Sequence, residues 1–159
     1  MSGLLRLSSI RGGRFVNHLP FGRALRRYLQ SAQALELLPG CGWLDGGCLI
    51  LRDALTHWSK GALRAGASVR SHRSVTYVDH GFAWFEANGQ RILLDGDGLQ
   101  DAAGLRQKLE RLEGIQPAGI LFSDEALIVG ILTDPKASRA LADRLSRRFG
   151  GFSSDLILG

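Results

Sequence analysis

The chain has 159 residues, of which 45% are hydrophobic, and this composition suits one compact domain with a buried core. Its longest apolar runs are far shorter than the roughly 20 residues of a membrane-spanning helix, so no integral membrane association is expected. The formal charge of +5 comes from 20 Lys and Arg against 15 Asp and Glu.

The positive charge is concentrated in the first half of the chain. Residues 1–80 carry eleven Lys and Arg against four Asp and Glu, and six arginines precede the first acidic residue, Glu36. Such a segment suits contact with nucleic acid, an acidic partner or an anionic membrane surface, and it also resembles a mitochondrial transit peptide. Because no nucleic-acid motif accompanies it, any nucleic-acid binding is expected to be weak. No apolar stretch of a secretory signal precedes it, so we expect a cytoplasmic protein or one delivered as an effector.

The first half is predicted to hold two helices followed by a β-hairpin. Residues 1–17 are predicted to form a loop or short strand, and the apolar spacing over 20–38, ended by Pro39-Gly40, predicts a helix. A second helix over 48–60 has apolar residues at 51, 54, 55 and 58. Strands follow at 67–72, 75–86 and 90–95, with Asn88-Gly89 as a favoured two-residue hairpin loop.

The second half is predicted to alternate helices and strands. A helix over 100–113 is followed by strands at 119–122 and 126–132, and the last helix begins with Asp134 as N-cap and Pro135 at its first position. Together these elements predict an α+β fold, with helices packed on a mostly antiparallel sheet and the helix of Cys48 lying across the strands of His80 and Asp95. We expect one domain over 1–159, with 115–159 as an alternative subdomain.

Cys48 lies where a cysteine gains reactivity. It follows Gly46-Gly47 and begins the predicted helix over 48–60. Free N–H groups and the positive end of the helix dipole stabilise a thiolate there, and the thiolate is the reactive form of cysteine. The glycines permit a sharp turn and close approach of a substrate, so the N–H of Cys48 is a candidate for an oxyanion hole.

His80 lies on the same predicted hairpin as two aspartates. The two-residue loop places Asp97 directly opposite His80 and Asp95 on the diagonal, with all three side chains on one face of the hairpin. Glycines at 81, 96 and 98 permit a bulge that would change this register. Either aspartate is therefore a candidate to orient the imidazole ring.

This order of residues resembles the papain-like group of thiol enzymes, which includes the NlpC-type peptidases and the transglutaminase-like proteins. The resemblance covers about residues 40–98 and is carried by Gly47-Cys48 at a helix start, His80 with Trp84 and Glu86 beyond it, and Asp95 fifteen residues after His80. Small phage and bacterial proteins of unassigned function also resemble this chain. The resemblance therefore implies a class of reaction and no particular substrate.

The resemblance implies a papain-like core in which Cys48 is the nucleophile, His80 its base and Asp95 the residue that orients His80. It implies a hydrolase, such as a thiol protease, or an acyltransferase, with a peptide, isopeptide or glutamine side chain as substrate. No cofactor or metal is implied. In such enzymes a further residue completes the oxyanion hole, and its candidates here are Trp43 and Gln33.

Other interpretations compete with this one. A lone buried cysteine is typical of an inert core thiol, and the cysteine and histidine spacings match no zinc site. Cys41 and Cys48 alone do not make a disulfide framework. The run from Asp95 to Asp101 resembles a calcium-binding loop, but Arg106 stands where a bidentate glutamate is needed. The alternative function is a non-enzymatic interaction or inhibitor protein whose basic N-terminal face binds an acidic partner or nucleic acid.

Overall fold

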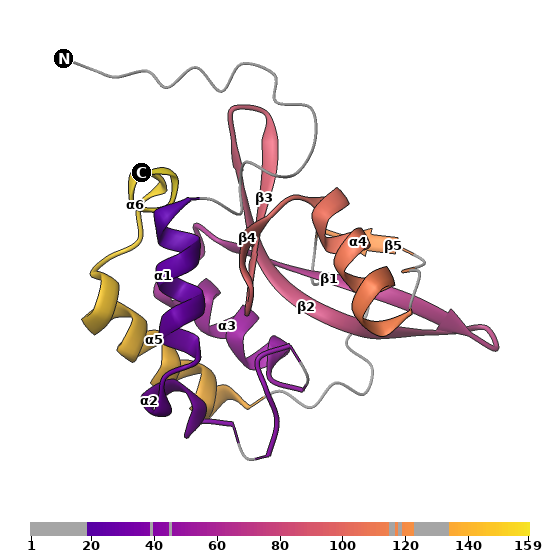
Figure 1. The fold of residues 1–159 in the computed structure, drawn as a ribbon, viewed down its shortest axis with the longest axis horizontal. Coiled ribbons are helices and arrows are strands. Elements are labelled where there is room, and N and C mark those ends of the chain that lie inside the picture. The colour runs from indigo at the N-terminus through magenta and orange to yellow at the C-terminus, as the bar shows by residue number, and fades with distance from the viewer. Residues whose placement is uncertain (1–18, 39, 45, 115–116, 118, 123–133) are drawn as a thin grey trace.

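The computed structural model describes residues 19–38, 40–44, 46–114, 117, 119–122 and 134–159, which form an α+β fold (Figure 1). The predictions for 1–17 and for a strand at 126–132 lie outside these residues. In chain order the elements are α1 (Pro20–Leu29), α2 (Ala32–Leu35), α3 (Cys48–Trp58), β1 (Arg64–His72), β2 (Val75–Ala87), β3 (Gln90–Asp95), β4 (Gly98–Gln100), α4 (Ala102–Glu113), β5 (Gly119–Leu121), α5 (Pro135–Phe149) and α6 (Ser154–Leu158).

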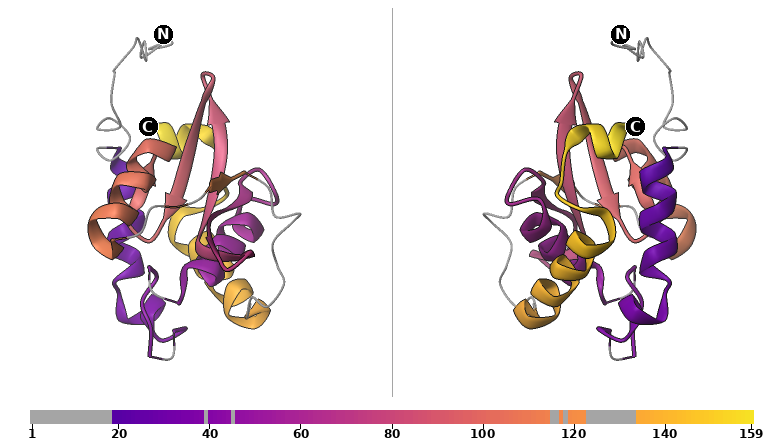
Figure 2. Two further views of the ribbon diagram at one scale, coloured as in Figure 1. Left: turned by 90° about the vertical axis from the view of Figure 1, so that its right-hand side faces the viewer. Right: turned by 90° about the vertical axis from the view of Figure 1, so that its left-hand side faces the viewer.

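The strands form one five-stranded sheet in the order β4-β3-β2-β1-β5, and each neighbouring pair is antiparallel, as predicted. Successive side chains point to opposite faces of the sheet. Ala83 and Leu94 belong to the larger core, which they share with α1, α3 and α5, whereas Trp84 and Leu93 belong to a smaller core under α4. Figure 2 shows α4 on the side of the sheet opposite α3 and α5.

The predicted helix over 20–38 is two helices, so the prediction of a single helix is wrong. Ser31 has an extended backbone, and its Oγ accepts a hydrogen bond from the N–H of Ala34, which makes Ser31 the N-cap of α2. The predicted start of the last helix is confirmed, since Asp134 caps α5 and Pro135 follows it. None of the described helices combines the length and apolar character needed to cross a bilayer.

The chain turns directly after Asp95. Asp95 pairs with Gly98 across a turn of Gly96 and Asp97, and β4 follows. The helix predicted from residue 100 therefore begins only at Ala102. The predicted pairing of His80 with Asp97 is wrong, because β3 ends at Asp95 and Asp97 lies in the turn.

β2 contains one extra residue next to His80. In the pairing of β1 with β2, Ser68 lies opposite His80 and Val69 lies opposite Val78, so Asp79 of β2 forms a β-bulge. Between β2 and β3 the register has no shift and agrees with the predicted hairpin loop. The glycines at 81, 96 and 98 therefore do not shift the register of the hairpin, and the bulge lies at Asp79, in the pairing of β2 with β1.

Candidate active site

Cys48 is the first residue of α3 and is 8% exposed. The loop before it closes on itself, because Gly42 and Gly46 form a bridge and the N–H of Gly47 donates to the carbonyl oxygen of Gly42 at 2.9 Å. A Cβ atom on Gly47 would lie 2.7 Å from that oxygen, closer than a side chain tolerates. The glycines thus hold the Cys48 thiol at the start of the helix.

Three groups around the Cys48 thiol favour its anion: the ring of His80 and the backbone N–H groups of Leu49 and Gly81. Burial alone would raise the pKa of this thiol. The hydrogen bond and charge of His80, together with the two N–H groups, outweigh burial and bring the pKa below its ordinary value of 9.0. The thiolate form of Cys48 is therefore favoured beside His80.

His80 is 2% exposed and connects the sulfur to a carboxylate. Its Nε2 lies 2.9 Å from Oδ2 of Asp95, which leaves Nδ1 as the ring nitrogen for Cys48. Burial alone would lower the pKa of His80, but the hydrogen bonds to Asp95 and Cys48 raise it from 6.5 to about 9. The two shifts act in the same direction, towards a thiolate on Cys48 and an imidazolium on His80.

Asp95 is 1% exposed and is saturated with hydrogen-bond donors. Its Oδ2 accepts from Nε2 of His80, from Nε2 of Gln100 at 2.6 Å and from Nζ of Lys108, while its Oδ1 accepts from the N–H of Asp97 at 2.9 Å. Burial alone would raise the pKa of Asp95, but the hydrogen bond from His80 and the charge of Lys108 hold it well below its usual range. Asp95 is therefore a carboxylate at neutral pH.

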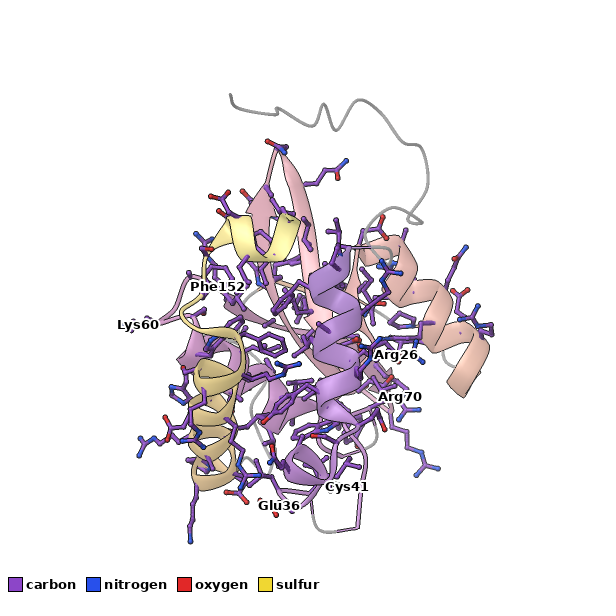
Figure 3. All side chains as sticks on the ribbon, turned by 60° about the vertical axis from the view of Figure 1, so that its left-hand side comes forward. Arg26, Glu36, Cys41, Lys60, Arg70 and Phe152 are labelled. Atoms are coloured by element: carbon purple, nitrogen blue, oxygen red, sulfur yellow. The ribbon has the colours of Figure 1, made fainter. Side chains whose placement is uncertain are left out.

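Asp97, the other candidate of the sequence, lies beside this cluster. Its Oδ2 is 3.3 Å from Nζ of Lys108, and its Oδ1 is 4.0 Å from Nε of Arg26. Arg26 points from α1 towards α4 (Figure 3). The structure thus brings Cys48, His80 and Asp95 together and places Asp97 next to Lys108.

Gln100 and Lys108 are not among the site residues predicted from the sequence. The sequence does indicate that Lys108 has a partner, because it lies between Leu105 and Leu109 on the inward face of α4, where a charged side chain needs one. The sequence does not indicate a role for Gln100, because β4 is not predicted from it.

Neither Trp43 nor Gln33, the two candidates for a second donor to the oxyanion, presents its side chain to Cys48. The indole N–H of Trp43 donates to the carbonyl of Leu29 at 2.6 Å inside the core. Gln33 lines a separate cavity of about 410 Å³ between α1, α2 and α5. The other residues that line the cavity are Tyr28, Glu36, Arg144, Arg147 and Arg148. The expectation for both Trp43 and Gln33 is therefore wrong.

Cys41 and Cys48 are both free thiols. Within the described ranges, no three His, Cys, Asp or Glu side chains are grouped so as to hold a metal ion. At the start of the run that resembles a calcium loop, the Asp95 carboxylate binds side chains of the protein itself.

Comparisons of the chain with models of protein families, with curated proteins and with solved structures find no match. The chemistry around Cys48 is therefore the basis for a functional assignment.

Proposed function

We propose that this protein is a cysteine hydrolase or acyltransferase that acts on an amide or related acyl bond through Cys48, His80 and Asp95. The observation that carries the proposal is a buried arrangement at a helix N-terminus: the Cys48 thiol has the His80 ring as its neighbour, and Nε2 of that ring lies 2.9 Å from Oδ2 of Asp95. A cysteine that only fills space in a core requires no such partner. A papain-like arrangement of the core is part of the same proposal.

In the proposed reaction, His80 takes the proton of the Cys48 thiol and the sulfur bonds to the carbonyl carbon of the substrate. N–H groups in the first turn of α3 stabilise the oxyanion. As the C–N bond breaks, His80 returns its proton to the leaving amine. Water, or a second amine, then attacks the thioester carbonyl while His80 accepts its proton. The C–S bond breaks, and His80 passes the proton to the Cys48 sulfur, which restores the thiol. Asp95 accepts the ring N–H of His80 and fixes its tautomer throughout.

The burial of the site favours narrow substrates. Cys48 is 8% exposed and His80 is 2% exposed, so the acyl group must arrive on a thin, extended chain. A peptide backbone, an isopeptide or a glutamine side chain has this shape. A peptide or protein is therefore the proposed substrate class.

The proposal is tested by comparing the two cysteines. Alkylation by iodoacetamide is measured against pH for Cys48 in Cys41→Ala and for Cys41 in Cys48→Ala. Cys48 is expected to react at least about tenfold faster near pH 6, because its thiolate persists there. Equal rates with an ordinary thiol pH profile would reject the proposal. Electrophilic activity probes that label Cys48 then identify the acyl group.

A second candidate function is the binding of an acidic partner, favoured by the arginines that the structure exposes. Arg23, Arg26 and Arg27 lie exposed on α1, and Arg147 and Arg148 line the cavity beside Glu36. Figure 3 labels Arg26 and Glu36. A fluorescent oligonucleotide tests this function by titration at increasing salt, since contacts that depend on charge weaken steeply as salt rises. We expect only weak binding that physiological salt abolishes, and a tight complex that survives would favour this second function.

A further inference from the structure

Lys108 is a buried lysine whose ammonium group lies within the candidate active site. The residue is 8% exposed, and its neighbours on the inward face of α4, Leu105 and Leu109, are 0% and 2% exposed. Lysine is almost never buried to this degree unless its charge is paired. Its Nζ contacts Oδ2 of Asp95 and lies 3.3 Å from Oδ2 of Asp97.

The contact with Asp95 places Lys108 close to His80. Nζ of Lys108 and Nε2 of His80 donate to the same oxygen, Oδ2 of Asp95. Nε2 of Gln100 donates to that oxygen as well, but without a charge. Lys108 and the imidazolium form of His80 thus share one buried carboxylate, and Cys48 is the neighbour of His80 on its other side.

We propose that Lys108 is a positioning residue that supplies a fixed positive charge to this cluster and thereby sets the pH range over which Cys48 and His80 form an ion pair. The inference rests on the proposed function. Lys108 does not touch the sulfur, so it acts through Asp95 and His80.

The sign of the effect follows from the charges. With Lys108 present, two cations balance the anions Asp95 and Cys48. The other charged groups packed around the site have partners of their own: Asp97 lies near the exposed Arg26, Asp79 pairs with Arg70, and the buried Arg52 of α3 pairs with Asp53. Without Lys108, the buried series of Asp95, His80 and Cys48 has one excess negative charge. Removal of a nearby positive charge makes each remaining proton harder to remove. Both the thiol of Cys48 and the imidazolium of His80 then lose their protons at higher pH.

The test uses alkylation of Cys48 in the full chain with Cys41→Ala. Lys108→Met is expected to move the midpoint of the alkylation profile upward by about one pH unit, the lower end of the effect of an adjacent charge. Lys108→Arg retains the charge and is expected to restore the wild-type midpoint. Gln100→Leu removes an uncharged donor from the same oxygen and should move the midpoint much less. Lys136→Met, on an exposed surface of α5, is the control for loss of a lysine elsewhere.

The outcomes separate the inference from the proposed function. One outcome is that the wild-type midpoint lies below that of an ordinary thiol and that Lys108→Met, shown to be folded by circular dichroism, has the same midpoint. This outcome overturns the inference and leaves the proposed function standing. If the wild-type midpoint is that of an ordinary thiol, the proposed function fails and the inference fails with it. Should Lys108→Met not fold, Lys108→Gln keeps a hydrogen-bond donor without the charge and must show the same upward shift.

Discussion

Asp95 is the residue on which the geometry of the site depends. Its carboxylate accepts hydrogen bonds from four donors, and one of them is the ring of His80. In Asp95→Asn, an amide replaces the acceptor of the His80 N–H, so the ring is no longer held in the tautomer that serves Cys48. We expect turnover to fall by about 10³-fold or more, whereas Asp97→Asn changes it by less than about tenfold. Hydrolysis of a chromogenic anilide that acylates Cys48 measures both variants.

Circular dichroism of both variants provides the control for folding. If Asp97→Asn lost more activity than Asp95→Asn while both remained folded, the orienting role would belong to Asp97. Such a result would require a rearrangement of the turn at Gly96, because in this structure Asp97 faces Lys108.

Single residues of the site differ in how well the sequence predicts them. Cys48, His80 and Asp95 were chosen because residue type, chain order and spacing point to the same chemistry. Gln100 and Lys108 reach Asp95 only because β4 and α4 pack against β3. No local pattern specifies that packing, so their contacts with Asp95 become visible only in three dimensions.

At the scale of elements, the glycines before α3, Gly42, Gly46 and Gly47, set the position of its first residue. A methyl group on Gly47 would lie 2.7 Å from the carbonyl oxygen of Gly42 and 2.9 Å from the side chain of Leu38. Gly47→Ala is therefore expected to displace the start of α3, lower the free energy of unfolding by about 1–3 kcal/mol and reduce the reactivity of Cys48. Urea unfolding and iodoacetamide alkylation measure the two effects.

The matched control is Gly42→Ala, in the same loop, because its Cβ would meet nothing within 4 Å. It is expected to leave both quantities near their wild-type values. Equal effects of the two substitutions would show that the loop does not position Cys48 through contact at Gly47.

Elements with local chemical signals were predictable, and those held by tertiary pairing were not. The Asn88-Gly89 loop specified the register of β2 and β3, and Asp134-Pro135 specified the start of α5, because turn and cap chemistry is local. β4 is three residues long and exists through its pairing with β3. The end of α1 before Ser31 cannot be predicted from the sequence, because the apolar spacing of 20–38 continues across it.

At the scale of the whole molecule, Asp95 makes stability depend on pH in the acid range. Its pKa in the folded protein lies well below the ordinary 3.8, so the unfolded chain takes up a proton first as the pH falls. The stabilisation is therefore complete above about pH 4 and is lost progressively at lower pH. We expect urea unfolding to give the wild type a larger free energy of unfolding than Asp95→Asn at neutral pH. This difference should shrink below about pH 4. A constant difference across this range would contradict the prediction.

The bulge at Asp79 has a consequence for how this molecule can change over evolution. It separates a hairpin arm, formed where residues 69–72 of β1 pair with 75–78 of β2, from the part of β2 that carries His80. A change that lengthens or shortens both strands of that arm equally leaves His80 opposite Ser68, because the pairs beyond the bulge set the register at the site. The arm is therefore open to paired insertions and deletions that leave the candidate site residues in place. Relatives of this chain are expected to align at His80 with gaps before it.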